Sequence, residues 1–298
     1  MVDLLKNQVQ TGASPFLTVA MPVYNAGKYL RLAVISIVRQ TFRDWELLVI
    51  DDGSTDNALQ GIADIIDPRI HIMRDGTNKG LAARLNEAIG LARGQYIARM
   101  DQDDVSYPDR FMRQIEMLEK DKCLDLVATR AITIDEYSMA SGFLPYRISH
   151  EKICARPWIG FYMPHPTWMG KTDWFRRHGY TIPGPYFCED QDLLLRSYTD
   201  SKFGTVPEIL FAYRLRSKLN TKKLFSTRRA VAGLQCRQFM AKRELSNFLL
   251  CLVVFVGRIS TDTLKFLRLL SFLKKQPKPI QTEDLMQWNE VNHTLSSV

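Results

Sequence analysis

The chain has 298 residues, of which 46% are hydrophobic and 24% are charged. This composition excludes wholesale disorder, and the length suits one sizeable α/β domain with an appendage. The formal net charge is +8, and the five cysteines are widely spaced without a CxxC pair, so neither a disulfide framework nor a cysteine zinc site is indicated. Residues 1–14 are polar and lack the apolar core of a signal peptide, so we expect a cytoplasmic protein.

Hydrophobic periodicity predicts alternating strands and helices over the first 120 residues. Strands are predicted at 16–21, 45–50, 70–73 and 96–100, and helices at 30–38, 57–66, 81–92 and 108–120. This alternation is typical of a mostly parallel sheet flanked by helices. In such sheets ligands bind beyond the carboxyl ends of the strands, where the polar clusters at Tyr24, Asp51 and Asp101 all fall.

The pattern changes twice further along the chain. Residues 139–188 are rich in proline, glycine and aromatic residues and show little periodicity, which is typical of functional loops. From Leu224 onward the pattern is helical again. The sequence therefore predicts an N-terminal tail at 1–14, an α/β domain at 15–220 and a helical, basic region at 221–298.

Three carboxylates, Asp101, Asp103 and Asp104, follow the strand predicted at 96–100. They repel one another unless a cation lies among them. Mg²⁺ or Mn²⁺ suits carboxylate oxygens and commonly bridges a protein to substrate phosphates. For this cluster alone, a solvated acidic turn before the helix at Pro108 is an equal alternative.

Two other stretches suggest contacts with a nucleotide. In Asp51-Asp52-Gly53, an acid at the end of a strand can hold a ribose hydroxyl or a base N–H, although a turn capped by Ser54 explains part of the motif. The helix start at 78–86 offers backbone N–H groups to a phosphate, and Arg84 can add a charged fork.

The irregular half contributes an acidic run and a histidine. Glu189-Asp190-Gln191-Asp192 precedes a helical run, so these acids either suit the helix dipole or include a general base near an acceptor hydroxyl. His165 stands between two prolines. It can ligate a metal or bond a phosphate, and a purely structural role is an equal alternative.

Taken together, these stretches resemble the family 2 glycosyltransferases of the GT-A fold. The resemblance covers residues 16–215, and its motifs follow one another in the family's order. The matching stretches are Pro22-Val23-Tyr24-Asn25, Gln40-Thr41-Phe42, Asp51 to Asp56, Asn78 with Gly80, Arg93-Gly94, Asp101 to Asp104, His165-Pro166-Thr167 and Glu189 to Leu193.

The resemblance implies a binding site for the donor. Asp52 is similar to the acid that holds the nucleotide base, and Pro22, Tyr24 and Asn25 would line that pocket. Asp101 is similar to the family residue near the ribose. The helix motif departs from the family because Arg84 is not followed directly by asparagine.

The resemblance also implies the chemistry. Asp103 would hold Mn²⁺ or Mg²⁺ on the diphosphate, with His165 as a further candidate ligand, and Asp190 matches the family's catalytic base. The family inverts the anomeric centre, so we expect inversion. The QxxRW signature of processive synthases is missing after the acidic run, which favours transfer of a single sugar.

The expected function is therefore transfer of one sugar from a nucleotide-diphosphate sugar, with a UDP-sugar favoured, to a hydroxyl of a glycan or lipid-linked saccharide. A non-catalytic nucleotide-sugar binder on the same scaffold is one alternative. A nucleotidyltransferase is a weaker alternative, because its glycine-rich basic first loop is missing. A dinucleotide-dependent oxidoreductase would need GxGxxG where the chain reads Pro22 to Gly27.

The basic charge is concentrated near the C-terminus. Arg214 to Lys278 holds sixteen Lys and Arg against two acids, so this segment carries +14 and the remainder −6. Within it, Leu245 to Ile259 is apolar but shorter than the roughly 20 residues of a membrane-spanning helix. We expect residues 221–278 to contact an anionic membrane at the inner face of the plasma membrane, with a core helix as the alternative. Nucleic acid is not expected, because no binding motif accompanies the charge.

Overall fold

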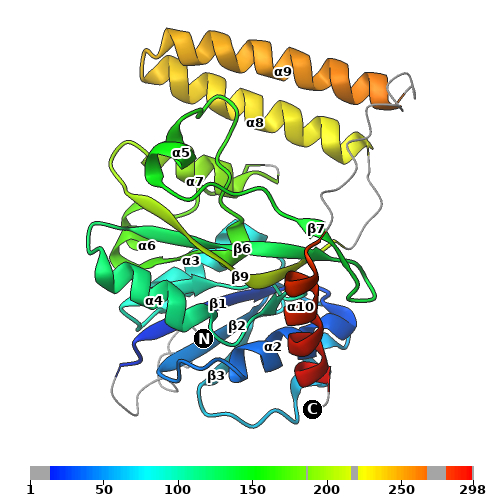
Figure 1. The fold of residues 1–298 in the computed structure, drawn as a ribbon. Helices are drawn as coiled ribbons and strands as arrows, with labels where there is room; N and C mark the ends of the chain where they lie inside the picture. Colours follow the sequence, from blue (N-terminus) through cyan, green and yellow to red (C-terminus); the bar gives the residue numbers. More distant parts are fainter. Residues whose placement is uncertain (1–13, 186, 216–220, 267–279, 297–298) are drawn as a thin grey trace.

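The structure is a computed structural model that describes residues 14–185, 187–215, 221–266 and 280–296 (Figure 1). The expected tail at 1–14 lies outside these residues except for Ser14. The strands are β1 (Leu17–Val23), β2 (Trp45–Asp51), β3 (Ile70–Arg74), β4 (Tyr96–Arg99), β5 (Val105–Ser106), β6 (Leu126–Ile134), β7 (Ala140–Phe143), β8 (Met169–Lys171) and β9 (Phe203–Arg214). The α-helices are α2 (Leu30–Val38), α3 (Leu81–Leu91), α4 (Arg110–Lys120), α5 (His150–Cys154), α6 (Thr172–His178), α7 (Glu189–Ser197), α8 (Thr221–Ala241), α9 (Leu245–Phe266) and α10 (Thr282–Ser296). The described residues also form three short 3-10 helices, η1 (Gly27–Tyr29), η2 (Ala58–Ile62) and η3 (His165–Thr167).

Nine strands in the described part of the chain form one sheet, in the order β3-β2-β1-β4-β8-β6-β9-β5, with β7 paired to β6. The strands β1 to β4 are mutually parallel, and β6 is parallel to β9. The antiparallel strand β8 joins these two groups, while β5 and β7 are antiparallel edge additions. Six of the nine strands thus share one direction, which confirms the mostly parallel α/β sheet predicted from the sequence.

Helices cover both faces of the sheet (Figure 1). Alternate side chains of a strand point to opposite faces of the sheet, so β1 contributes to two hydrophobic cores. Val19 belongs to the core that includes α2 and α4, and Ala20 belongs to the core that includes α3, α6 and α7. Phe111 of α4 and Trp174 of α6 are fully buried in these two cores. Burial on both faces explains why the strands read as nearly continuous apolar runs.

The sequence located the regular elements of the first half well, with one clear difference. The helix predicted at 57–66 is reduced to the 3-10 helix η2. Gly61 has a low α-helix propensity, and Asp56 Oδ1 accepts a hydrogen bond from the Ala58 N–H at 3.2 Å, which favours a turn at this point. The region at 139–188, which shows little periodicity, contains α5, α6, β7 and β8. Each of these has at most seven residues, which is too short for a periodic pattern.

The C-terminal region divides into two parts. The helices α8 and α9 form an antiparallel pair that lies over α5 and α7, and α10 returns to the sheet beside α2 (Figure 1). Within α9, Leu245–Leu264 has a mean hydropathy of 1.5, and only 6% of the residues in its most apolar window are buried. By length and composition alone this segment suffices to cross a membrane, because it is longer than the apolar stretch at 245–259 seen in the sequence.

Candidate active site

A cavity of about 790 Å³ opens at the carboxyl ends of β1, β2 and β4. Its walls combine these strand ends with the start of α7 and one residue of α8. Seven of the nine residues that the sequence suggested for the site line it: Pro22, Tyr24, Asp52, Asp101, Asp103, His165 and Asp190. Of the other two, Arg84 donates to Asp52 of this wall, whereas Asn25 follows Tyr24 in the chain and bonds Ser54, which is outside the lining.

The acidic loop after β4 sends its carboxylates in different directions. Asp101 and Asp103 line the cavity, and Asp101 forms an ion pair of 2.7 Å with Arg99. Asp104 is buried, and its Oδ1 accepts a bond from the backbone N–H of Arg214 at 2.7 Å. Burial, followed by the charges of Asp101 and Asp103, raises the pKa of Asp104 well above its usual value. Asp104 is therefore an internal support of the loop.

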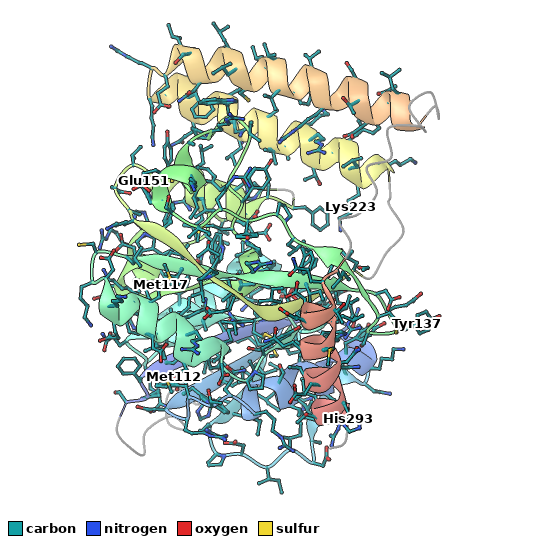
Figure 2. All side chains as sticks on the ribbon, in the orientation of Figure 1. Met112, Met117, Tyr137, Glu151, Lys223 and His293 are labelled. Carbon is teal, nitrogen blue, oxygen red and sulfur yellow. The ribbon has the colours of Figure 1, made fainter. Side chains whose placement is uncertain are left out.

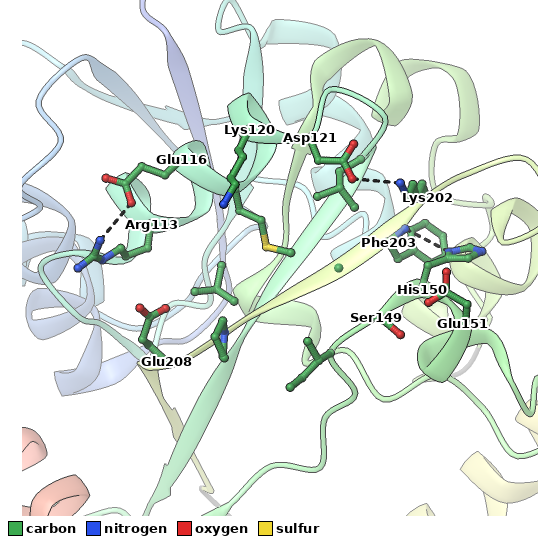
Figure 3. A pocket seen from close by; sticks show the side chains of 16 residues that line it. Arg113, Glu116, Lys120, Asp121, Ser149, His150, Glu151, Lys202, Phe203 and Glu208 are labelled. Carbon is green, nitrogen blue, oxygen red and sulfur yellow. Dashed lines mark hydrogen bonds and ion pairs between the residues drawn. The ribbon is translucent and has the colours of Figure 1, made fainter.

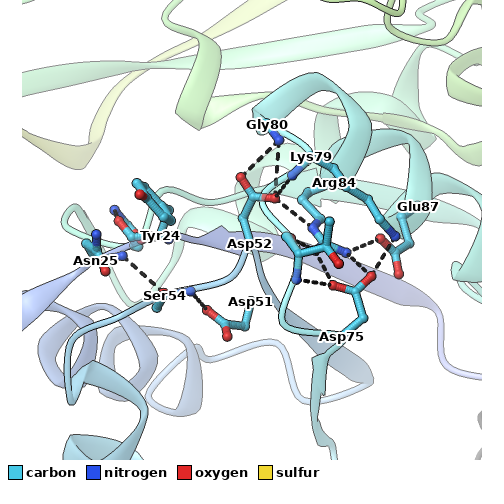
Figure 4. A network of polar contacts seen from close by, with 12 residues as sticks. Tyr24, Asn25, Asp51, Asp52, Ser54, Asp75, Lys79, Gly80, Arg84 and Glu87 are labelled. Carbon is cyan, nitrogen blue, oxygen red and sulfur yellow. Dashed lines mark hydrogen bonds and ion pairs between the residues drawn. The ribbon is translucent and has the colours of Figure 1, made fainter.

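Asp52 caps the start of α3 (Figure 4). Its carboxylate accepts bonds from the backbone N–H groups of Lys79 and Gly80 at 2.7 and 3.0 Å, and from Nε of Arg84 at 2.9 Å. The guanidinium of Arg84 is 1% exposed and also pairs with Asp75 and Glu87. The start of α3 and Arg84 thus have an internal partner, Asp52, where the sequence suggested a phosphate.

Asn25 braces two neighbouring loops. Its φ is 49°, and its side-chain oxygen accepts bonds from the backbone N–H groups of Thr55 and Asp56 at 2.8 and 3.3 Å. Its own N–H donates to Ser54 Oγ at 3.1 Å (Figure 4). These contacts hold the loop after β1 against the loop after β2, and thereby fix the wall that carries Tyr24.

The acidic run at the start of α7 is split between the cavity and the interior. Glu189 and Asp190 line the cavity. Gln191 bonds Phe161 through both its side-chain oxygen and nitrogen, and Asp192 accepts bonds from Thr181 and Arg196. Burial raises the pKa of Asp190, while a hydrogen bond from the amide of Gln191 at 3.2 Å opposes the shift. Such a carboxylate is a stronger proton acceptor than an ordinary aspartate once it is ionised.

His165 is 9% exposed and lies between the cavity and Tyr180. Its Nε2 is 2.8 Å from the Tyr180 hydroxyl, and its Nδ1 is 3.9 Å from Glu189 Oε1. Burial and the nearby charge of Arg99 hold the pKa of His165 well below its usual value. The imidazole is therefore neutral at physiological pH, and its hydrogen bond fixes the ring against Tyr180.

The donor set of the cavity suits a hard divalent cation held jointly with a ligand. Asp101 and Asp103 present carboxylate oxygens, which Mg²⁺ and Mn²⁺ prefer. Across residues 14–296 as far as they are described, no group of three or more His, Cys, Asp or Glu side chains is placed to hold a metal by itself. A cation bound here would need substrate phosphates and water as further ligands.

Several residues of the cavity were not identified from the sequence. Arg99 is buried at its base, and its Nε and Nη1 have no hydrogen-bond partner among the described residues. Lys223 comes from α8 (Figure 2), and its Nζ lies 4.0 Å from the centroid of the Phe187 ring. Lys223 is 119 positions or more from the strand-end motifs, so only the folded chain brings it to the site.

A second pocket of about 640 Å³ lies between α4, α5 and β9 (Figure 3). Four of its charged side chains form two ion pairs, Arg113 with Glu116 at 3.2 Å and Lys202 with Asp121 at 3.0 Å. The strand-end carboxylates lie elsewhere, in the larger cavity. We therefore assign the candidate active site to the 790 Å³ cavity.

Comparison with known proteins agrees with this geometry. The model of the glycosyl transferase family 2 matches residues 18–179. The O-antigen biosynthesis glycosyltransferase WbnJ of Escherichia coli is 32% identical over 248 residues, which cover 80% of this chain and 94% of that protein. A second E. coli protein, the UDP-Glc:alpha-D-GlcNAc-diphosphoundecaprenol beta-1,3-glucosyltransferase WfgD, is 32% identical over 48% of this chain and 57% of its own length.

The fold is also similar to that of S. aureus TarS 1-349, solved in complex with UDP-GlcNAc. The TM-score is 0.58 at 16% identity, and the match covers 94% of this chain and 80% of that one. A complex of TarS with UDP gives the same TM-score of 0.58. The chain therefore belongs to glycosyl transferase family 2 and is a glycosyltransferase with a GT-A-type α/β fold.

Proposed function

We propose that this enzyme transfers one sugar, with inversion, from a UDP-sugar to a hydroxyl of a glycan or lipid-linked saccharide. One observation carries the proposal: two acidic groups far apart in sequence line the same cavity. Asp101 and Asp103 come from the loop after β4, and Glu189 and Asp190 come from the start of α7. The chemistry needs two sites of this kind, one for the departing diphosphate and one for the attacking hydroxyl.

The donor would lie across the strand ends. Pro22, Tyr24 and Asp52, which line the cavity, would form the wall for the nucleoside, and Asp101 would lie towards the ribose. Asp103 would hold Mn²⁺ or Mg²⁺ on the diphosphate, and the cation would neutralise negative charge on the leaving group. The TarS complexes with UDP and UDP-GlcNAc support a uridine nucleotide for this fold.

Asp190 would act on the acceptor. As the acceptor oxygen forms a bond to the anomeric carbon, the bond from that carbon to the diphosphate oxygen breaks and UDP leaves. The hydroxyl proton moves to the Asp190 carboxylate, which the amide of Gln191 orients. A single displacement with one base places the new bond opposite the old one, which gives inversion.

The donor and the stereochemistry can be tested together. A panel of nucleotide sugars with Mn²⁺ should raise the melting temperature most for the true donor, and a UDP-sugar is expected to rank first. The product's anomeric configuration, measured by NMR coupling constants, should be opposite to that of the donor. A product that retains the donor's configuration would contradict the single displacement.

We further propose that α9 lies in an anionic membrane surface at the inner face of the plasma membrane. Four apolar side chains at helical spacing lie on its outer face, and each is between 60% and 69% exposed: Leu245, Leu249, Val253 and Val256. Its other face packs on α8, and Arg258 donates to the Ile159 carbonyl at 2.9 Å, so the helix would have to leave both partners to cross a bilayer. The name of WfgD gives its acceptor as a saccharide on diphosphoundecaprenol, and this supports a lipid-linked acceptor at such a surface for the present chain.

Liposome binding tests this surface. The doubly substituted Leu249→Asp/Val253→Asp protein should bind anionic liposomes at least about tenfold more weakly than the wild type, because each buried apolar side chain contributes about 1.5–3 kcal/mol. Met286→Asp, at an exposed position of α10, is the matched control and should bind normally. Equal binding of the wild type and the double variant in a sedimentation assay would rule out this face as the contact.

A further inference from the structure

The helix α10 packs against the strands that surround the acidic loop. Trp288 and Leu295 of α10 are 1% and 3% exposed and belong to a core shared with β5, β6 and β9. The Trp288 ring stacks on Tyr107, with centroids 6.2 Å apart and planes at 22°. Tyr107 directly follows β5, which in turn follows the loop that carries Asp103. Figure 1 shows α10 in red against this side of the sheet.

Hydrogen bonds continue from α10 to that loop. Trp288 Nε1 donates to the backbone carbonyl of Ser138 at 2.9 Å, in the turn between β6 and β7. The Ser138 hydroxyl accepts from Arg214 Nη1 at 3.0 Å. Arg214 Nε then donates to the Asp103 carbonyl at 2.8 Å, and the Arg214 N–H donates to Asp104 Oδ1 at 2.7 Å. Trp288, Ser138 and Arg214 thus connect α10 to the backbone of Asp103.

The acidic loop needs such support. Asp101 and Asp103 carry like charges two residues apart, and their repulsion opposes this close placement unless a cation lies between them. Arg214 is 4% exposed, so its bonds to the loop are shielded from water. A site that holds a cation requires ligand placement within about 0.5 Å, which depends on the groups behind the ligands.

We propose that α10 is a brace for the Asp103 loop, and that Trp288 is a positioning residue acting through Ser138 and Arg214. This proposal rests on the proposed role of Asp103 in holding a divalent cation on the donor diphosphate. The last described helix of the chain would thus support the donor site, although Trp288 lies 185 positions after Asp103 in the sequence.

Titration of UDP in the presence of Mn²⁺ tests the brace in the full-length protein. Trp288→Phe keeps a ring on Tyr107 but removes the N–H donor to Ser138, so the affinity for UDP with Mn²⁺ should fall about threefold to tenfold. The affinity for uridine, which has no phosphate, should stay at the wild-type value. Arg214→Lys, which keeps the charge but loses the planar fork, should have a larger effect on the same UDP affinity.

Leu295→Ala is the matched control, because it removes packing from α10 two helical turns beyond Trp288. It should lower the melting temperature and leave the affinity for UDP with Mn²⁺ unchanged. If Trp288→Phe and Arg214→Lys also change only the melting temperature, the brace is refuted. Asp103→Asn in the same titration separates the two proposals. If Asp103→Asn binds UDP with Mn²⁺ as tightly as the wild type, the proposed role of Asp103 is refuted. If Asp103→Asn loses this affinity while Trp288→Phe keeps it, only the brace is refuted.

Discussion

Replacing Asp190 with asparagine is expected to lower the turnover number of sugar transfer by about 10²- to 10⁴-fold, the usual contribution of a general base. Asparagine keeps the size and the hydrogen bond to Gln191 but cannot accept the hydroxyl proton. The donor should still bind with wild-type affinity, because Asp190 lies on the acceptor side of the proposed site. Initial rates and calorimetric binding of UDP with Mn²⁺ measure these two effects separately.

The pH dependence gives a second measurement on the same residue. Burial raises the pKa of Asp190, so the carboxylate takes up a proton at a higher pH than an ordinary aspartate does. Since the protonated form cannot act as a base, the rate should fall as the pH decreases through this raised pKa. The raised pKa also means that ionised Asp190 disfavours the folded state at neutral pH, so Asp190→Asn should melt at the wild-type temperature or above it.

Asp192→Asn is the control for this substitution. It makes the same change two residues along α7, where the carboxylate bonds Thr181 and Arg196 inside the protein. Asp192→Asn should therefore lower stability and leave the turnover number within a few-fold of the wild type. If Asp190→Asn loses UDP affinity and turnover to the same extent, Asp190 serves donor binding and another group is the base.

The first half of the fold could be predicted from the sequence because its strands and helices are long and locally patterned. The strand predicted at 45–50 is β2, and the helix predicted at 108–120 is α4 with a later start. The arrangement of β6, β8 and β9 could not be predicted in this way. These strands pair with partners up to 107 residues away, as Ala212 of β9 does with Val105, and no local period encodes such pairing.

In the site, too, local sequence patterns indicate the motifs, whereas contacts between distant residues decide how their side chains point. A run of neighbouring aspartates cannot reveal which carboxylate faces a ligand. Asp104 turns inward because the backbone of Arg214, which is 110 positions later, donates to it. Likewise, the charge pattern of the C-terminal region predicted basic helices, but it did not indicate that Trp288 returns to the acidic loop. Local chemistry identified the motifs, and long-range packing decided the orientation of each side chain.

Replacing Asp103 with asparagine is expected to lower the affinity for UDP in the presence of Mn²⁺ by about 10²-fold or more. A carboxylate that holds a cation on a diphosphate contributes several kcal/mol, and each 1.4 kcal/mol corresponds to a factor of ten. Uridine binding should be unaffected, because the proposed nucleoside wall of Tyr24 and Asp52 remains intact. Competition binding with UDP, UMP and uridine, with and without Mn²⁺, measures where along the donor the loss occurs.

Asp104→Asn is the sharpest control for this result, because it makes the same change at the next residue. The Asp104 side chain faces inward, and burial raises its pKa, so a neutral amide that still accepts the Arg214 N–H resembles its protonated form. Asp104→Asn should therefore keep the Mn²⁺ dependence of UDP binding. Equal losses in the two variants would mean that the loop acts only as a fold element, whereas a loss confined to Asp103→Asn and to phosphate-bearing ligands would place the cation at Asp103.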